Sequence, residues 1–203
     1  LDHMAHHTGQ HVLSQAFIRV AEAETVGFHL SPQSVTIDLD RADLTPADID
    51  AAGALANEII RRDAPVTVRF VTHEEAAALP LRKTPPGRDG RLRLVDIAGF
   101  DLTACGGTHV ARTGEVGLIK IARTERRGAT GHGATGHGAT GHGATTRVEF
   151  LCGARALADY GHKQDIVRRL SEALTTGAAE LPAAVVKIQD ENKALRVELR
   201  RRE

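Results

Sequence analysis

The first segment of the chain places its apolar side chains at helical spacing. Within residues 2–24, Leu13 and Phe17 fall on one side of a helix that turns about 100° per residue. His7 and His11 lie about 40° from each other and well away from that apolar stripe. The pattern therefore predicts a helix that buries one face and presents two imidazoles, one turn apart, on another.

Alternating apolar positions predict strands in the middle of the chain. Val35, Ile37 and Leu39 alternate with polar residues, as in a strand with one buried face. Thr45 and Pro46 then mark a helix start, as cap and first helical residue. The remaining predicted elements are a helix to residue 62, strands over 66–71, 92–97, 117–122 and 146–151, a short helix from Thr72 to about Leu79 and a basic loop over 81–93. This order indicates an α+β fold, with a mainly antiparallel sheet packed with helices.

The C-terminal part is predicted to be helical. Residues 163–176 form one amphipathic segment, and a second begins at Leu181. In the second, a seam of positions recurs at alternating steps of four and three, which is a heptad pattern. The seam consists of Leu181, Val185, Ile188, Asn192, Leu195 and Leu199. It fits an αα-hairpin arm or the start of a longer coiled coil, so a homodimer through these helices is one expectation.

Residues 128–145 have a different composition. Gly-Ala-Thr-Gly-His occurs three times and is followed by Gly-Ala-Thr. Without large apolar groups the segment cannot bury enough surface to offset its conformational entropy. We therefore expect a flexible loop joining the last two strands, in which His132, His137 and His142 bind metal loosely at most.

Charge and cysteine content narrow the class of protein. The 203 residues include 26 Lys plus Arg and 26 Asp plus Glu, so any nucleic-acid surface would have to be local. Cys105 and Cys152 are the only cysteines, too few for a disulfide framework. With no signal peptide or long apolar run evident, a reducing, cytoplasmic setting is favoured. We expect a piece of a longer protein, with a domain over 1–152 and a helical linker over 153–203 towards a further C-terminal domain.

Two short motifs carry the chemistry. His7 and His11 are four residues apart on the first helix, and Cys105 and His109 flank a Gly-Gly-Thr turn. Three imidazoles and one thiol are a suitable ligand set for a tetrahedral zinc. Thr8 stands where the HExxH metalloproteases carry their glutamate base, so that class is not indicated.

The residues alone leave the role of the zinc open. If all four side chains bind it, the site is closed and structural; if one is displaced, a water or substrate group takes the fourth position. Gly9 costs about 1 kcal/mol relative to Ala in a helix, so something other than helix stability favours it, such as close approach by a ligand. The alternatives at this point are a zinc hydrolase and a zinc-stabilised binding domain.

The pairing of HHTGQH with DLTACGGTHVARTGEVG about a hundred residues later resembles one family closely. It is similar to the editing domain of alanyl-tRNA synthetases and to free-standing alanyl-tRNA editing proteins, whose fold recurs as the second additional domain of threonyl-tRNA synthetases. The resemblance covers roughly residues 2–152, with the LRKTPPG loop and the IKIARTERR and TRVEFLCG strands.

That resemblance implies a zinc-dependent deacylase. It would cleave the ester that joins a wrong amino acid, chiefly serine or glycine, to tRNA(Ala). The implied zinc ligands are His7, His11, Cys105 and His109. Residues for the amino-acid pocket are less well defined, and the candidates are Gln33, Ser34 and Thr108.

Two positions depart from the family pattern. Gln10 replaces the threonine that usually precedes the second histidine, and Ser31–Ser34 only approximates a Gln-x-Gly-Ser segment. The choice between serine and glycine therefore stays open, as does the identity of the general base.

Basic residues near these motifs are candidates for contact with the acceptor end of tRNA(Ala). Arg82 and Lys83 lie in the basic loop, and Arg112 follows the second motif, so we expect them to meet phosphates or terminal nucleotides. The alternative function is a non-catalytic, zinc-stabilised module for tRNA binding or dimerisation.

Overall fold

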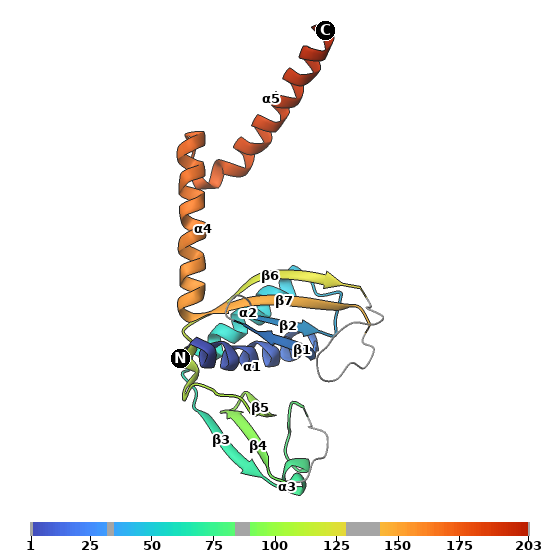
Figure 1. The fold of residues 1–203 in the computed structure, drawn as a ribbon, viewed down its shortest axis with the longest axis vertical. Coiled ribbons are helices and arrows are strands. Elements are labelled where there is room, and N and C mark those ends of the chain that lie inside the picture. The colour runs from blue at the N-terminus through green and yellow to red at the C-terminus, as the bar shows by residue number, and fades with distance from the viewer. Residues whose placement is uncertain (1, 32–34, 84–89, 129–142, 203) are drawn as a thin grey trace. The chain divides into compact units, whose positions relative to one another are not determined.

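The structure is a computed structural model that describes residues 2–31, 35–83, 90–128 and 143–202. The chain divides into two compact units, Leu1–Ala156 and Leu157–Glu203. The predicted α+β class is confirmed, but the strands form two antiparallel sheets instead of one. Figure 1 shows the elements of both units.

The larger sheet has four strands in the order β1-β2-β7-β6. Their bounds are Thr25–Leu30 for β1, Val35–Leu39 for β2, Thr145–Cys152 for β7 and Ile119–Arg127 for β6. Buried and partly exposed residues alternate strictly along β7, so one face of this central strand meets the core. Helices α1 (Asp2–Ala21) and α2 (Pro46–Arg61) pack against each other and against this sheet (Figure 1).

The smaller sheet has three strands in the order β3-β4-β5. These are Val66–Val71, Leu92–Ile97 and Asp101–Ala104, and the short helix α3 (His73–Ala77) lies beside them. Val71, Ala76 and Leu94 form a small apolar cluster between α3 and one face of the sheet. Val95 and Ile97 point the other way, into the main core, which joins this sheet to α1.

Helix α1 is buried on nearly every side between residues 5 and 17. The predicted single buried face is wrong, because α1 lies between the two sheets and also contacts α2 and the 3₁₀ helix η1 (Thr113–Val116). His7 and His11 do point away from the apolar stripe, yet they are buried because protein covers that side as well. A polar buried helix needs hydrogen-bond partners for its side chains.

Local signals located several elements well. Thr45 and Thr72 form capping boxes with Asp48 and Glu75, at the two helix starts where the sequence predicts them. Strands β1 and β5 were not predicted, because the first carries glycine and histidine and the second has only four residues. Helix α4 (Gly153–Leu174) begins ten residues before the predicted 163.

The repeat lies almost wholly outside the described residues. Strands β6 and β7 pair antiparallel up to Arg127 and Thr145, so the segment between them connects a hairpin, as expected. His132, His137 and His142 are not described.

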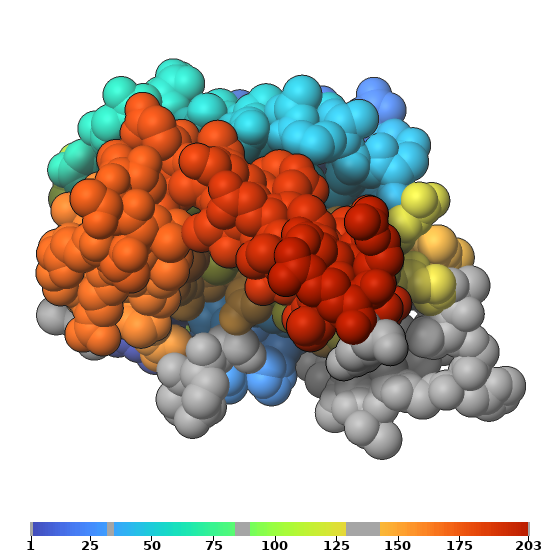
Figure 2. Space-filling model, turned by 90° about the horizontal axis from the view of Figure 1, so that it is seen from above, coloured from blue at the N-terminus to red at the C-terminus, as the bar shows by residue number. Residues whose placement is uncertain are grey.

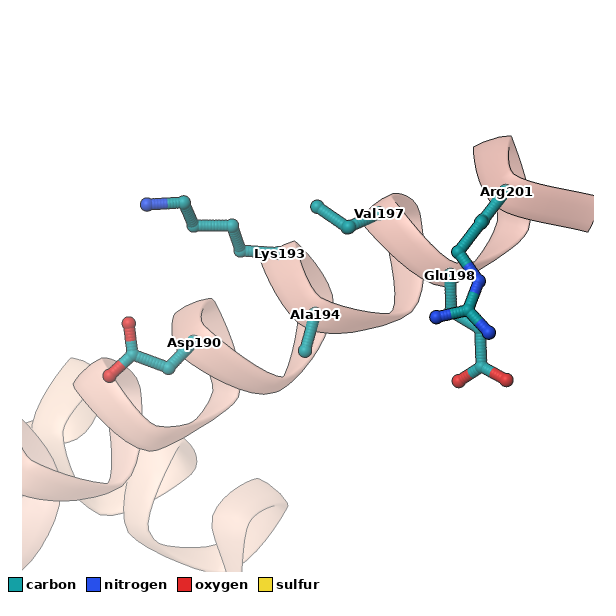
Figure 3. A pocket seen from close by; sticks show the side chains of 6 residues that line it. All are labelled: Asp190, Lys193, Ala194, Val197, Glu198 and Arg201. Carbon is teal, nitrogen blue, oxygen red and sulfur yellow. The ribbon is translucent and has the colours of Figure 1, made fainter.

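The C-terminal unit contains most of α4, the short η2 (Ala178–Glu180) and α5 (Leu181–Arg202). The predicted start of the last helix at Leu181 is confirmed. Seam residues Ile188, Leu195 and Leu199 are exposed, and Figure 2 shows the α5 surface in red. A shallow hollow along α5 is lined by side chains of that helix alone, so no second element of the described chain encloses it (Figure 3). Its lining residues are Asp190, Lys193, Ala194, Val197, Glu198 and Arg201.

Among the helices of the described residues, none has the length and apolar content needed to cross a membrane.

Candidate metal centre

Four side chains from two distant segments meet in one cluster. His7 and His11 come from α1, while Cys105 and His109 come from the turn after β5. One ligand atom from each lies within 4.8 Å of all the others. The two motifs that the sequence pairs by residue type therefore come together in the fold.

The distances within the cluster suit a tetrahedral zinc. Cys105 Sγ lies 3.5 Å from His7 Nε2 and 3.4 Å from His109 Nε2. Zinc bonds of about 2.3 Å to sulfur and about 2.0–2.1 Å to nitrogen, set at tetrahedral angles, separate the two ligand atoms by about 3.6 Å. The residues present thus fit the metal in donor chemistry and in spacing.

Glycine in the turn makes the cluster possible. A Cβ added at Gly107 would overlap the imidazole of His7, whereas one added at Gly106 would meet nothing within 4 Å. Neither residue has a positive φ. Gly107 is therefore required by the close approach of His7, and Gly106 is not restricted in this way.

Asp101 holds the ring of His11 through Nδ1. Its Oδ2 lies 3.2 Å from His11 Nδ1, and Arg82 donates from Nε to Oδ1 over 2.6 Å. The Asp101 side chain is fully buried and that of Arg82 is 11% exposed. With Nδ1 directed at a carboxylate, His11 would offer Nε2 to a metal ion, which is the usual arrangement of a zinc-bound histidine.

Thr8 holds the ring of His109 in a similar way, through a hydrogen bond to Nδ1. Its Oγ1 lies 3.1 Å from His109 Nδ1 and accepts a hydrogen bond from the backbone N–H of Val110. Because that N–H donates to Oγ1, the hydroxyl is fixed between α1 and the turn. For His7, by contrast, Nδ1 is buried and has no hydrogen-bond partner among the described residues. Packing against Gly107 holds this ring instead.

The cluster favours the thiolate form of Cys105. Burial alone would raise the pKa of this thiol, but hydrogen bonds from His109, His11 and His7 outweigh it and lower the pKa to about 3. Thiolate is the form in which cysteine binds zinc. Burial also lowers the pKa of His109, which favours its neutral, metal-binding form.

The Asp101–His11 pair is held together by charge. Burial alone would raise the pKa of Asp101, but its hydrogen bonds with His11 and Arg82 lower it. For His11, burial would lower the pKa, and the bond to Asp101 raises it above the ordinary value. The carboxylate therefore stays ionised beside the ligand.

His6 and Gly9 lie on the opposite side of α1. His6 bonds through Nδ1 to the Asp2 carbonyl oxygen and accepts from the Cys152 N–H through Nε2, so both of its nitrogens are used. A Cβ added at Gly9 would lie 2.5 Å from Cys152 Sγ. The group that approaches Gly9 closely is thus a buried thiol and not the ligand that the sequence suggests.

The residues predicted for the amino-acid pocket are only partly described. Thr108 is exposed beside the buried His109, and Gly106 is exposed too, so the turn forms an open side of the cluster. Gln33 and Ser34 lie outside the described residues. Gln10 is buried and donates to Ser14 Oγ, which also accepts from Thr25 Oγ1, so this departure from the family pattern lies within a polar chain.

The three predicted tRNA-contacting residues differ in their surroundings. Lys83 is exposed. Arg112 is half-exposed and paired with Asp63 at 2.5 Å. The Arg82 side chain, expected to meet phosphate, instead binds the buried Asp101. Sequence reasoning assigned no role to Asp101, although it opens the DLTACGGTH motif four residues before Cys105.

Comparison with known proteins gives the cluster a family context. Residues 92–131 match the threonyl and alanyl tRNA synthetase second additional domain. The alanyl-tRNA editing protein Aarsd1 of Danio rerio is 32% identical over 96% of this chain and 44% of its own length. The resemblance is confirmed.

Other relatives extend the likeness to editing proteins and ligases. The alanyl-tRNA editing protein AlaX-L of Pyrococcus horikoshii is 29% identical over 97% of this chain and 47% of its own length. The alanine–tRNA ligase of Pyrococcus abyssi is 31% identical over 98% of this chain and 21% of its own. The chain thus spans less than half of each of these relatives, and the likeness to them extends over 96–98% of the chain.

Proposed function

We propose that this chain hydrolyses the ester bond of mischarged tRNA(Ala), releasing serine and, as a second substrate, glycine. The observation that carries the proposal is the cluster of His7, His11, Cys105 and His109, whose spacing suits zinc. The similarity to alanyl-tRNA editing proteins over nearly the whole chain supplies the substrate class. Zinc is the cofactor that this donor set favours.

Each ligand has its own support. Asp101 orients His11, Thr8 orients His109, and Gly107 leaves room for the ring of His7. If one of the four side chains is displaced, a zinc ion held there would supply Lewis acidity for the ester carbonyl and an anchor for the amino group or hydroxyl of the amino acid. The open side at Gly106 and Thr108 is where a substrate would enter, and Thr108 is a candidate for the pocket.

Asp101, a carboxylate in contact with the cluster, is unsuited to act as general base. Asp101 is fully buried and both of its oxygens are engaged, by His11 and by Arg82. A general base must reach the proton that it removes. We therefore assign Asp101 to positioning and leave proton removal to water or to the 2′-hydroxyl of the terminal nucleoside.

The acceptor end of the tRNA would meet residues around the open side. Lys83 is free to approach phosphate, and Arg112 can do so from its half-exposed pair with Asp63. Gln33 and Ser34 remain proposed pocket residues. A cytoplasmic location fits a protein that acts on tRNA.

A deacylation assay tests the proposal. The zinc-loaded 203-residue chain is incubated with Ser-tRNA(Ala), Gly-tRNA(Ala) and Ala-tRNA(Ala), and release of each amino acid is followed. We expect rapid loss of serine, slower loss of glycine and near-complete retention of alanine. Cys105→Ala should abolish the activity, and full activity in this variant would contradict the metal role.

A second candidate function rests on the C-terminal unit. The apolar seam of α5 is exposed at Val185, Ile188, Leu195 and Leu199, which favours self-association. In this case the chain would be a non-catalytic, zinc-stabilised module for tRNA binding or dimerisation. It would bind tRNA(Ala) without deacylating it, and removal of zinc would unfold the first unit.

A further inference from the structure

Phe28 occupies an unusual place beside the metal cluster. It lies on the edge strand β1 directly opposite Ile37, so the two side chains share one face of the sheet. Ile37 is fully buried beneath the helices, whereas Phe28 on the same face is 57% exposed. The protein therefore leaves an aromatic ring uncovered on the side of the sheet that faces the cluster.

The ring of Phe28 stacks on that of His7. Their centroids are 6.0 Å apart and their planes differ by 23°. His7 in turn lies 3.5 Å from Cys105 Sγ through its Nε2. The exposed ring of Phe28 is therefore separated from the atoms of the cluster only by the ring of His7.

Other phenylalanines behave differently. Phe17, Phe100 and Phe150 are buried in the core. Phe70, on β3 of the smaller sheet, is 54% exposed and makes no aromatic contact with a cluster histidine among the described residues. Exposure of a large ring costs stability that burial would otherwise provide, so an exposed ring beside a reactive cluster points to a ligand.

The chemistry of the proposed reaction identifies that ligand. In an aminoacyl-tRNA the ester oxygen and the terminal base are substituents of the same ribose, so a carbonyl at the cluster brings the base close to it. Each nucleobase offers a flat π face, and stacking on aromatic side chains is the common way in which proteins hold unpaired bases.

We propose that Phe28 is the stacking platform for the base of the nucleoside whose ester is cleaved, which is adenine at the end of tRNA. This inference rests on the proposed function, because it takes the ester as the substrate. It assigns the nucleobase to β1, beside His7.

A binding experiment tests the platform without requiring hydrolysis. The probe is tRNA(Ala) with 2-aminopurine as its 3′-terminal base and serine attached by an amide, which resists hydrolysis. Stacking quenches 2-aminopurine fluorescence. We expect quenching by the zinc-loaded chain, retention in Phe28→Tyr, and roughly tenfold weaker binding with loss of quenching in Phe28→Leu. Phe70→Leu is the matched control and should behave as the unaltered chain does.

Zinc affinity separates the platform from a structural role. If Phe28 only supports His7, Phe28→Leu will bind zinc more weakly, which would overturn the proposal. If it is the platform, zinc affinity in a chelator competition will be unchanged while quenching is lost. Equal quenching in Phe28→Leu and Phe70→Leu would also overturn it.

The outcome is distinguishable from failure of the proposed function. If the unaltered chain releases no serine from Ser-tRNA(Ala) but quenches the probe through Phe28, the editing activity is wrong and the base site stands. If serine is released at the same kcat/KM by the unaltered chain and Phe28→Leu, the activity stands and the base site is wrong.

Discussion

Helix α1 carries buried histidines on two sides, and their neighbours decide what each can do. On one side His7 and His11 meet Cys105 and His109, with ligand atoms within 4.8 Å of one another. On the other side His6 bonds to the Asp2 carbonyl and to the Cys152 N–H, which uses both of its ring nitrogens. Burial is similar on both sides, so burial alone does not mark a site; a free nitrogen directed at other ligand atoms does.

The two cysteines sharpen the same contrast. Three histidines surround Cys105, and they lower the pKa of its thiol to about 3 despite the opposing effect of burial. Burial raises the pKa of Cys152, which packs against Gly9 of α1 and, among the described residues, belongs to no cluster of metal-binding side chains. One cysteine is prepared to bind a metal as thiolate, and the other fills space in the core as a neutral thiol.

The largest expected effect is on zinc affinity, after a substitution in the turn that carries Cys105 and His109. Gly107→Ala places a methyl group where the ring of His7 lies, so the ligand must move out of the cluster. We expect zinc to bind more than about 100-fold more weakly, beyond the roughly 10–100-fold typical for outer contacts. Gly106→Ala has open space around its Cβ and is the matched control. Chelator competition measures both, and equal affinities would contradict the close approach.

A smaller loss is expected when the support of His11 is weakened. Asp101→Asn keeps an oxygen for the His11 Nδ1–H but removes the charge that binds Arg82. Zinc affinity should fall roughly 10–100-fold. Asp96→Asn, a change of the same chemistry on the neighbouring strand β4, serves as control. An unchanged affinity in Asp101→Asn would show that the carboxylate does not position the ligand.

On the far side of α1 the expected effect is on stability. Gly9→Ala should lower the free energy of unfolding by about 1–3 kcal/mol, because its Cβ would lie 2.5 Å from Cys152 Sγ. In a Cys152→Ala background the sulfur is gone and the next neighbours are 3.5 Å away. There Gly9→Ala should be neutral or stabilise by up to about 1 kcal/mol, through helix propensity. Urea unfolding of the four proteins gives this cycle, and additive effects would refute the contact.

The smallest effect concerns alkaline pH. Burial keeps Cys152 protonated in the folded state, while the unfolded thiol ionises above about pH 8.5. Its contribution to stability is therefore complete below that pH and is lost as the pH rises, by roughly 1.4 kcal/mol per unit at most. We expect the unfolding free energy to fall more between pH 8 and 10 in the unaltered chain than in Cys152→Ala. Parallel curves for the two zinc-loaded proteins would contradict a buried neutral thiol.

Much of this arrangement could be predicted from the sequence. The ligand set followed from residue type and from the four-residue spacing of two motifs, because i and i+4 positions share a helix face. The starts of α2 and α3 followed from Thr45 and Thr72, whose side chains cap the helices locally. Local features of this kind do not depend on distant parts of the chain.

Tertiary structure alone decided which histidine does what. His3, His6, His7 and His11 all lie in the first helix, and His3 and His7 have the same spacing as His7 and His11. His11 becomes a supported candidate ligand because Asp101, 90 residues away, bonds to its ring and is itself bound by Arg82, 19 residues before it. From the sequence, Gly9 likewise suggests room for a ligand, but in the fold Cys152 of β7 packs against it. Spacing fixes what a helix can present, whereas long-range packing decides what each side of the helix meets.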